Sequence, residues 1–361
     1  MPRPQLTAVI DTYNHERFIE KAVVSVLEQD LSPEEIEIIV VDDGSTDRTP
    51  DIVKKFEPRV QFVRKANGGQ ATAFNAAMRE SSGEIVAFLD GDDWWARSKV
   101  RVVLDAFSKH PMIAAVGHGY FEVNEDSVTT AAVSPERALI LDLSSPEAAR
   151  VADLGRMLLG TSRLAVRRRV MHQVGPLPSE LVFCADTPIY SLALALGGAL
   201  ILNEPLCYYR VHAGGLSSRG PDNLAKQQRN FELLGFLHTL LARRLAELGV
   251  SEQIIAALFE SERVEMERFE LQRGGGGRLR AFKAETRAFQ SSYKDSSAGY
   301  KVFKGLIGLL ALVLPPQRFY DLRHWYSRQS SMHRIRNLMG RGQPTVPDSL
   351  FQRRRVTGEQ K

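Results

Sequence analysis

Three carboxylates stand within four positions, directly after a run of apolar residues. Residues 85–95 read IVAFLDGDDWW, so Asp90, Asp92 and Asp93 follow a stretch typical of a buried strand. Carboxylates this close repel one another and raise each other's pKa values, so a positive group should lie among them. A divalent metal ion, which binds oxygen ligands, is the simplest such group. The residue types therefore predict a metal site at the end of this strand.

Two more polar clusters follow apolar runs earlier in the chain. Residues 11–14 (DTYN) come after LTAVI, and residues 42–45 (DDGS) come after IEIIVV. In open sheets of parallel strands, ligands bind beyond the carboxyl ends of the strands. If all three runs are strands of one such sheet, their polar ends meet at one edge. We expect a site there that is rich in carboxylates and faces a polar ligand.

The elements that must position these clusters alternate between strand and helix. Apolar runs predict strands over 6–10, 36–41, 60–63 and 84–89, and helices are predicted over 46–56 and 69–79. A further helix should follow Asn14, which can cap it, with an apolar face of Phe18, Ala22, Val23, Val26 and Leu27. This alternation is typical of an α/β fold with a doubly wound, mostly parallel sheet flanked by helices.

The pattern is less regular in the next part of the chain. Residues 186–196 (DTPIYSLALAL) predict a helix capped by Asp186 and ended by Gly197-Gly198. Around this helix we expect strands over 112–117 and 120–123, a loop over 127–145, and extended segments over 200–201 and 206–211.

The C-terminal part is helical and then basic. Residues 222–272 predict amphipathic helices, and four glycines at 274–277 predict a linker. The predicted organisation is a domain over 1–219 with halves 1–110 and 111–219, a helical extension over 220–273, and a basic, partly amphipathic region over 274–361.

Composition and charge limit the class of protein. The chain has 361 residues, 43% hydrophobic and 25% charged, as ordinary folded proteins have. Cys184 and Cys207 make no disulfide framework, and we see no secretory signal, so we expect a cytoplasmic protein. Residues 278–361 hold 17 Lys+Arg and 5 Asp+Glu, a net charge of +12, which leaves −8 of the total +4 for residues 1–277. A basic C-terminal region predicts an anionic partner, either a membrane surface or nucleic acid.

An apolar run within the basic region favours the membrane surface. Residues 305–314 (GLIGLLALVL) fall well short of the ~20 residues that a spanning helix needs. Basic residues flank the run, and aromatic residues such as Phe319 and Tyr320 follow it. The segment should therefore either lie on the anionic inner face of the cytoplasmic membrane or pack on the rest of the protein. We expect no nucleic acid partner, because the charges do not alternate with base-stacking residues.

Five segments of the chain resemble family 2 glycosyltransferases, the inverting nucleotide-sugar enzymes of GT-A fold. The resemblance covers roughly residues 5–215. The segments are, in order, VIDTYNHERFIEKAVVSVLEQ, IEIIVVDDGSTDRT, NGGQATAFNAAMRESSGEIVAFLDGDDWW, VGPLPSELVFCADTPIYSLALALGG and EPLCYYRVH. The resemblance implies transfer of a sugar from a nucleotide-diphosphate sugar to an acceptor hydroxyl. The acceptor would be a glycan or a lipid-linked glycan, in the assembly of surface polysaccharide or glycolipid.

The resemblance also implies roles for individual residues. Asp186 matches the general base, with helix capping as the structural alternative. The acidic motif would hold Mn²⁺ or Mg²⁺ and contact the ribose, and which carboxylate does which stays open. The metal candidates are Asp92, Asp93 and His212. The candidates for the nucleotide sugar are Thr12, Tyr13, Asn14, Asp43, Asn67, Gly69, Asp90 and Gly91. Trp94 and Trp95 could stack on a sugar, and Arg210 could bind phosphate.

The chain departs from the family pattern at three positions. Asp11 stands where the family usually has proline, Phe74 where many relatives have arginine, and Ala185 where an acidic residue is commoner. These departures keep open a catalytically silent homologue that binds nucleotide or glycan as an assembly factor. A nucleotidyltransferase is a further alternative, but it would usually carry a glycine-rich, basic loop where this chain has DTYNHERF.

Overall fold

The computed structural model describes residues 3–143, 148–212, 224–292, 298–328 and 351–355. The chain divides into two compact units. The sheet unit comprises residues 1–144, 154–250 and 351–361, and the helical unit comprises residues 145–153 and 251–350.

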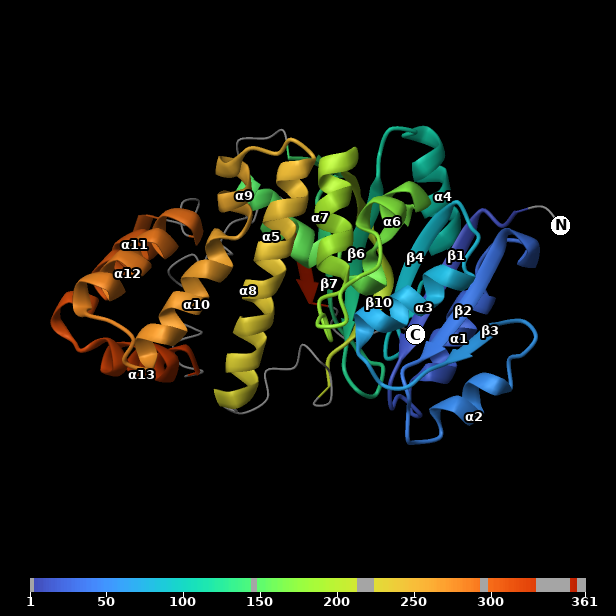
Figure 1. Ribbon diagram of the computed structural model, residues 1–361, viewed down its shortest axis with the longest axis horizontal. Coiled ribbons are helices and arrows are strands. Elements are labelled where there is room, and N and C mark those ends of the chain that lie inside the picture. Colours follow the sequence, from blue (N-terminus) through green and yellow to red (C-terminus); the bar gives the residue numbers. More distant parts are fainter. Residues whose placement is uncertain (1–2, 144–147, 213–223, 293–297, 329–350, 356–361) are drawn as a thin grey trace. The chain divides into compact units, whose positions relative to one another are not determined.

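The sheet unit is built on four parallel strands. They are β1 (Leu6–Thr12), β2 (Ile36–Asp42), β3 (Gln61–Arg64) and β4 (Ile85–Asp90), in the spatial order β4-β1-β2-β3 (Figure 1). The chain runs outward from β1 to β3 and then returns to the other side of β1 as β4. Doubly wound sheets bind ligands where the strand order reverses in this way. All four strands predicted for this part of the chain are confirmed.

Beyond β4 the sheet becomes mixed. β9 pairs antiparallel with β4 and β6, β7 pairs antiparallel with β6, and β10 runs parallel to β6. β5 and β8 pair with β10, and β11 pairs with β7. The bounds are β5 Trp94–Trp95, β6 Ala115–Val123, β7 Thr129–Pro135, β8 Leu139–Leu141, β9 Ala165–Arg167, β10 Ala199–Arg210 and β11 Phe351–Arg355.

Two predictions for this region are wrong. The expected loop over 127–145 contains β7 and β8. In β7 the buried positions are held by residues as small as Ala131, which give a weak apolar signal in the sequence. The two strands expected over 112–117 and 120–123 form the single strand β6, because its pairing with β10 continues through His118 and Gly119.

Helices cover both faces of the four parallel strands. On one face, α1 (Ile19–Leu27) and α4 (Lys99–Lys109) pack in one buried cluster with strand residues such as Leu89. On the other face, α3 (Gln70–Glu80) places Phe74 against Phe88, with ring centroids 4.6 Å apart. Successive residues of a strand point to opposite faces, so Phe88 and Leu89 serve different layers.

The other helices complete the sheet unit. Their bounds are η1 Pro33–Glu35, α2 Thr49–Lys54, η2 Thr161–Arg163, α6 Arg168–Val174, α7 Asp186–Leu196 and α8 Leu224–Glu247. α5 (Ala148–Leu158) includes residues of both units.

The first helix begins later than the sequence predicts. α1 starts at Ile19 with Phe18 as its N-cap residue, so the expected cap at Asn14 is wrong. Asn14 has a φ of 56° and serves the neighbouring loop. Its backbone N–H donates to Ser45 Oγ, and its side-chain oxygen accepts from the Thr46 N–H, both at 2.8 Å. The polar loop after β1 is therefore tied to the polar loop after β2.

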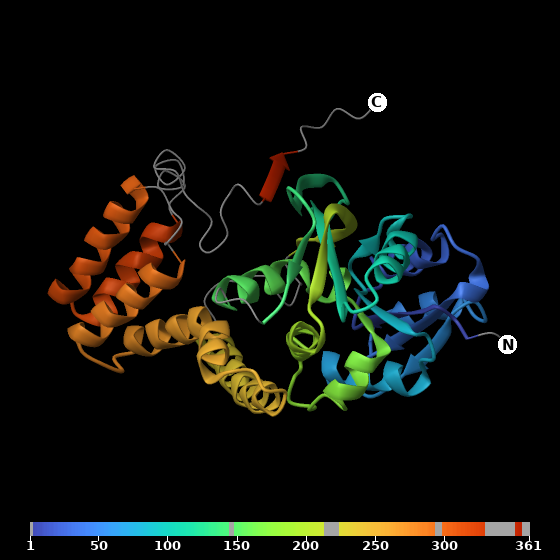
Figure 2. The ribbon, with the colours of Figure 1, turned by 90° about the horizontal axis from the view of Figure 1, so that it is seen from above.

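The helical unit contains five helices among its described residues. They are α9 (Glu252–Leu258), α10 (Glu260–Gln272), α11 (Arg278–Ser292), α12 (Ala298–Val313) and α13 (Pro316–Arg328). Figure 2 shows α11, α12 and α13 lying side by side, in orange to red-orange. In the part of the chain that the structure describes, no helix is both long and apolar enough to cross a membrane.

The core of the helical unit joins apolar residues to one buried ion pair. The apolar cluster consists of Leu271, Ala281, Ala284, Ala311, Phe319 and Tyr320. Phe319 and Tyr320 are buried, so these two aromatic residues belong to the core and are not anchors in a membrane surface. Arg268 of α10 donates two hydrogen bonds to the Glu285 carboxylate of α11, at 2.8 and 2.9 Å.

Candidate active site

The polar ends of β1, β2 and β4 meet at one edge of the sheet. Asp11 is the register partner of Asp90 on the neighbouring strand. The N–H of Gly91 donates to the Asp11 carbonyl oxygen, and the N–H of Asp43 donates to the Thr12 carbonyl oxygen, both at 2.9 Å. The prediction that the three clusters share one sheet edge is therefore confirmed.

Asp11 and Asp90 form a half-buried carboxyl pair. Burial and the charge of Asp92 raise the pKa of Asp11 to about 8. Burial and the charge of Asp11 raise the pKa of Asp90 well above its usual value. Asp11 Oδ1 is buried and has no hydrogen-bond partner among the described residues. Two carboxyl groups held this way resist joint ionisation unless a cation or a donor group joins them.

Asp92 faces His212 at the same edge. Asp92 Oδ2 lies 2.9 Å from His212 Nε2, and both side chains are largely buried. Burial alone would raise the pKa of Asp92, but the hydrogen bond from His212 and the charges of His15 and His212 hold that pKa below its usual value. The same hydrogen bond raises the pKa of His212. Gly91 keeps the turn compact, because a Cβ there would lie only 2.7 Å from Thr12 Oγ1.

Asp93 and Arg210 hold the framework of this turn together. Asp93 is 2% exposed, and its Oδ1 accepts from the Arg210 backbone N–H at 2.8 Å. The Arg210 guanidinium donates to the carbonyl oxygens of Asp92 and Glu125 and to Ser127 Oγ. The Arg210 guanidinium is thus held by protein partners, so Arg210 is not included in the ligand-binding groups proposed below. Asp93 Oδ2 is buried and has no hydrogen-bond partner among the described residues, so Asp93 stays a candidate ligand for a cation.

The loops after β1 and β2 supply the candidate nucleotide surface. Thr12 is buried, whereas Tyr13 is 43% exposed. Asp43 is buried and accepts from the N–H groups of Gly68 and Gly69, at 3.0 and 2.7 Å, besides pairing with Lys65. The carboxylate of Asp43 therefore fixes the loop that precedes α3.

Asp186 turns toward the site instead of capping its helix. It is the first residue of α7, Ala185 occupies the N-cap position, and no side chain caps this helix. Asp186 Oδ2 accepts from the Thr161 N–H at 2.9 Å. The prediction of Asp186 as a helix cap is therefore wrong. Burial raises the pKa of Asp186, while the Thr161 hydrogen bond and the charge of Arg163 act in the opposite direction.

Comparison with known proteins identifies the family. A model of the family described as Glycosyl transferase family 2 matches residues 7–170. An uncharacterized glycosyltransferase of Nostoc sp., alr2836, is 31% identical over 252 residues, which cover 66% of this chain and 76% of that protein. The chain belongs to glycosyltransferase family 2.

Two further similarities agree with this assignment. EpsJ of Bacillus subtilis, an uncharacterized glycosyltransferase, is 28% identical over 222 residues, 59% of this chain and 63% of EpsJ. The crystal structure of S. aureus TarS 1-349 in complex with UDP-GlcNAc superposes with a TM-score of 0.58 at 18% identity, covering 88% of this chain and 92% of that one. TarS is named a poly(ribitol-phosphate) beta-N-acetylglucosaminyltransferase, and the sequence similarity spans 94 residues at 34% identity, 25% of this chain and 16% of TarS. The superposition shows that this family 2 glycosyltransferase has the GT-A fold.

The structure places the three departures from the glycosyltransferase pattern in different settings. Asp11 lies in the site and adds a carboxyl group beside Asp90. Phe74 is fully buried against Phe88, so no cation is available at that position. Ala185 is fully buried, and its N–H donates to Gln70 Oε1 at 3.2 Å.

Sequence reasoning missed three residues that connect the two halves of the glycosyltransferase site. Gln70 Nε2 donates to Asp90 Oδ1 at 3.0 Å and to Thr161 Oγ1 at 3.2 Å. Ser162 Oγ accepts from the Asp90 N–H at 3.1 Å. Together with the bonds of Thr161 to Asp186 and of Ala185 to Gln70, these contacts link the acidic motif to α7. No spacing in the sequence signals this link, because the partners lie between 20 and 115 positions apart.

Two cations, Lys99 and Arg163, lie close enough to Asp93 for their charges to interact with it. Lys99 is fully buried, with Nζ 3.8 Å from the Trp95 ring centroid and 2.8 Å from the Ser162 carbonyl oxygen. Burial lowers the pKa of Lys99 to about 7. Arg163 stacks over the Tyr120 ring, 4.7 Å from its centroid. Trp95 belongs to the hydrophobic core and is only 2% exposed, so we leave it out of the proposed acceptor surface.

Trp94 remains at the edge of the site. Its ring stacks on Tyr208 at 4.8 Å, with 8° between the planes. Lys21 Nζ lies 3.5 Å from the centroid of the same ring. Trp94 is only 8% exposed because Tyr208 and Lys21 already cover its ring, so we leave it, like Trp95, out of the proposed acceptor surface.

The residues present fit a divalent ion that shares its ligands with a substrate. Within the described part of the chain, no group of three or more His, Cys, Asp or Glu side chains is arranged to hold a metal ion. Asp92 and His212 nevertheless converge, and Asp11 Oδ1 is a buried oxygen without a partner in the same region. Magnesium-type sites commonly use one or two protein carboxylates and take further oxygens from substrate phosphates.

Proposed function

We propose that this glycosyltransferase moves a sugar from a nucleotide-diphosphate sugar to the hydroxyl of a glycan or lipid-linked glycan, with inversion at the anomeric carbon. One observation carries the proposal. The acidic motif at Asp90 and the carboxylate of Asp186 belong to one hydrogen-bonded network through Gln70 and Thr161. A donor-binding group and a potential base are thereby held together at the edge where parallel strands end.

The donor would bind along the loops after β1, β2 and β4. Tyr13 and Asn67 are exposed there and would contact the base, with Thr12, Asn14, Asp43 and Gly69 shaping the loops around it. Asp90 and Gly91 would contact the ribose. TarS, which shares the fold, has been crystallised in complex with UDP-GlcNAc. That complex supports a nucleotide sugar as the class of ligand.

Asp92, Asp93 and His212 would hold Mn²⁺ or Mg²⁺. A bound divalent ion would supply positive charge for the leaving diphosphate. The side chains of Asp92 and His212 fix each other's orientation, because Asp92 Oδ2 and His212 Nε2 lie 2.9 Å apart.

Asp186 would take the proton of the acceptor hydroxyl as the new glycosidic bond forms. A carboxylate is a much weaker base than an alkoxide, so proton transfer and bond formation must occur together and depend on position. The Thr161 N–H holds Asp186 Oδ2, and among the described residues Oδ1 has only a 3.4 Å contact to the Thr187 hydroxyl. Oδ1 is thus the oxygen available to an acceptor.

The enzyme would act at the inner face of a membrane, to which the chain would be bound peripherally. A lipid-linked glycan would present its hydroxyl there, as in surface polysaccharide or glycolipid assembly. The basic charge of residues 278–361 is the observation that supports this location.

The first test is calorimetric binding of UDP, GDP, dTDP and CMP, each with and without Mn²⁺, to the wild type and to Asp92→Ala. We expect tight binding of one nucleotide that requires both the ion and Asp92. No metal-dependent binding of any of the four would overturn the metal assignment.

The second test separates binding from turnover. Asp186→Asn should bind the same nucleotide with unchanged affinity but lose about 10²–10⁴ in kcat, the usual range for a general base. Asp105→Asn, which removes a surface carboxylate of α4, is the matched control and should behave as wild type. Tight nucleotide binding without turnover in the wild type, across many donor and acceptor pairs, would favour the silent homologue.

A further inference from the structure

The apolar side chains that the protein leaves exposed are concentrated on α12. Sixteen large hydrophobic residues are exposed among the described residues, and six of them lie on this one helix. They are Val302, Leu306, Leu309, Leu310, Leu312 and Val313, with exposed fractions between 40% and 66%. The others are scattered over many elements, so the exposed apolar side chains of the described residues are concentrated on α12.

The opposite side of α12 packs in the core of the helical unit. The helix is therefore folded in place, and its exposed apolar face lies at the surface. Tyr300, Gly308 and Ala311 are buried, and Ala311 belongs to the core of the helical unit. A Cβ added at Gly308 would lie 3.7 Å from the Glu285 Cβ of α11. Residues 302, 306, 309, 310 and 313 follow a helical period on the other side. A helix that is apolar on both sides requires a second apolar surface or medium.

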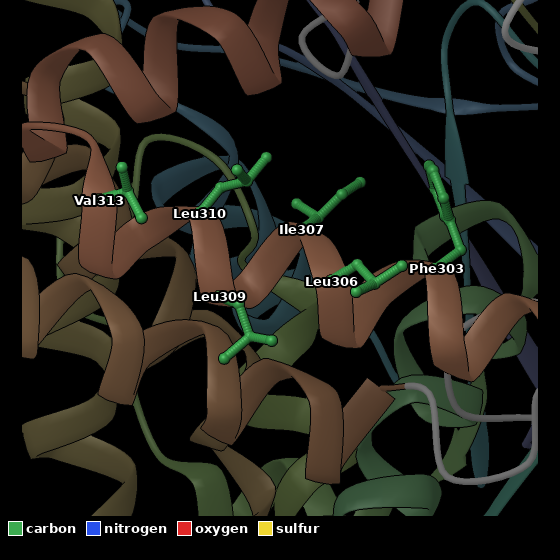
Figure 3. Close-up of a pocket in the computed structure, with 6 residues that line it drawn as sticks. All are labelled: Phe303, Leu306, Ile307, Leu309, Leu310 and Val313. Atoms are coloured by element: carbon green, nitrogen blue, oxygen red, sulfur yellow. The ribbon is translucent and has the colours of Figure 1, made fainter.

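An apolar hollow runs along this face. It is lined by Phe303, Leu306, Ile307, Leu309, Leu310 and Val313, whose side chains stand along α12 in Figure 3. No charged or hydrogen-bonding side chain belongs to this lining. The lining can therefore accept hydrocarbon but offers nothing to a polar ligand.

The charged residues within and next to α12 are mainly basic, with Asp295 and Asp321 standing just outside this stretch. From residue 296 to residue 320 the sequence contains Lys301, Lys304 and Arg318 and no Asp or Glu. Lys304 lies near Glu285, whereas Arg318 is exposed on α13 directly after the helix. An apolar helix face with basic residues at its margins is complementary to acyl chains below anionic headgroups.

We infer that the α12 face, defined by Val302, Leu306, Leu309, Leu310 and Val313, docks the protein on an anionic lipid surface. The helix lies in the headgroup region, its apolar side chains enter the acyl boundary, and Lys301 and Arg318 contact anionic headgroups. This inference names the partner of the membrane-bound location proposed above, and it requires neither a nucleotide nor turnover.

The test is flotation of the full-length protein with vesicles of phosphatidylcholine alone and of phosphatidylcholine with one third phosphatidylglycerol. We expect the wild type to bind the anionic vesicles at least tenfold more tightly than the neutral ones, with binding that weakens as salt rises. The double variant Leu306→Gln/Leu310→Gln should lose about tenfold or more in partition coefficient, because two leucines no longer enter the lipid.

Leu279→Gln is the matched control. Leu279 is 61% exposed on α11 of the same unit, and Leu306 is 60% exposed. The control should bind vesicles as the wild type does. Equal binding of the wild type and the double variant would overturn the inference. So would a wild-type dimer in sedimentation equilibrium that the double variant dissociates, because the face would then bind a second copy.

Amide hydrogen exchange of the wild-type protein tests the same face without any variant. Amides of α12 should gain protection with anionic vesicles, whereas those of α4 should not change. Vesicle binding without protection of α12 would overturn the assignment of this face. Loss of nucleotide binding by Asp92→Ala with vesicle binding intact would separate the two proposals.

Discussion

Gln70 gives the sharpest test of how the two halves of the site are held together. Its side-chain amide donates to Asp90 and Thr161 and accepts from the Ala185 N–H at the start of α7. Gln70→Met keeps the length of the side chain but removes all three hydrogen bonds. Asp90 Oδ1 and the Ala185 N–H then lose these partners at buried or half-buried positions.

The structure sets the size of the expected effects. An unsatisfied buried polar group costs about 1–3 kcal/mol, and Thr161 can rotate its hydroxyl, so we expect about 2–4 kcal/mol of destabilisation. A unit of this size loses about 2–4 °C in Tm per kcal/mol, so Tm should fall by about 4–16 °C. Because α7 carries Asp186, a shift of its first turn should lower kcat by about 10–100-fold. KM for the donor should change by less than about threefold, since Ser162 still holds the Asp90 N–H.

Gln70→Glu divides the network differently. It keeps an acceptor for the Ala185 N–H but places a second carboxylate against Asp90 Oδ1, 3.0 Å from the original nitrogen. We expect kcat to recover relative to Gln70→Met, while KM for the donor rises because of like-charge repulsion beside Asp90.

The assay is steady-state transfer with the donor identified by calorimetry, beside thermal unfolding of each variant. Gln61→Met is the control, because Gln61 makes an exposed hydrogen bond to Glu80 on the same unit. A Gln70→Met enzyme with lowered Tm but kcat within twofold of the wild type would refute the reasoning, since the network would then be structural only. Identical kinetics of the Met and Glu variants would refute the division of roles.

Three further predictions concern buried charges. Burial lowers the pKa of Lys99 to about 7, so above pH 7 the unfolded chain binds more protons than the folded chain, and the free energy of unfolding rises with pH. Lys99→Met should remove about 2 kcal/mol of this rise between pH 7 and 9, measured by urea unfolding. The raised pKa of Asp11, about 8, means that the folded chain binds more protons between pH 4 and 8, so stability falls as pH rises; Asp11→Asn should therefore gain stability relative to the wild type at pH 8 but not at pH 4. Arg268 faces Glu285 in the core of the helical unit, so Glu285→Ala should lower the stability of that unit by about 3 kcal/mol, measured by circular dichroism in urea. Arg268 and Arg323 outweigh the burial of Glu285 and lower its pKa, so this contribution should be present at pH 7 and lost as pH falls below 4. A pH-independent difference between wild type and variant would contradict each of the first two predictions, and an unchanged urea midpoint would contradict the third.

The sequence predicts best where one strong local signal decides the structure. β1, β2 and β4 are continuous apolar runs, which suit strands buried on both faces, and α7 ends at its expected glycines. Because these strands are parallel, the polar clusters that follow them lie at the same edge of the sheet. β7 was missed because its buried positions hold small residues and its pairing with β6 is a tertiary contact.

The roles within the site were harder to predict, because they depend on which partner each side chain finds. A sequence that reads Asp-Thr-Pro at a helix start favours an N-cap, yet Asp186 accepts from Thr161, 25 positions away. Arg210 has a side chain that suits phosphate, but the fold gives its guanidinium protein partners, whereas Asp93 keeps one buried carboxylate oxygen without a partner among the described residues. Gln70 has no local signal at all, since its function lies in joining segments that are distant in the chain.

The balance of charges at the site supports a bound metal ion, even though few protein side chains converge there as ligands. Asp11, Asp90, Asp92 and Asp186 gather at one edge, and the nearby cations are Lys99, Arg163 and Arg210, whose guanidinium donates to the Asp92 carbonyl oxygen. Burial holds the pKa of Lys99 near 7, so at neutral pH it supplies only part of a charge. A diphosphate would bring more negative charge to this edge, and burial strengthens the repulsion. Positive charge must therefore arrive with the donor, and the paired Asp92 and His212 are the side chains placed to receive it.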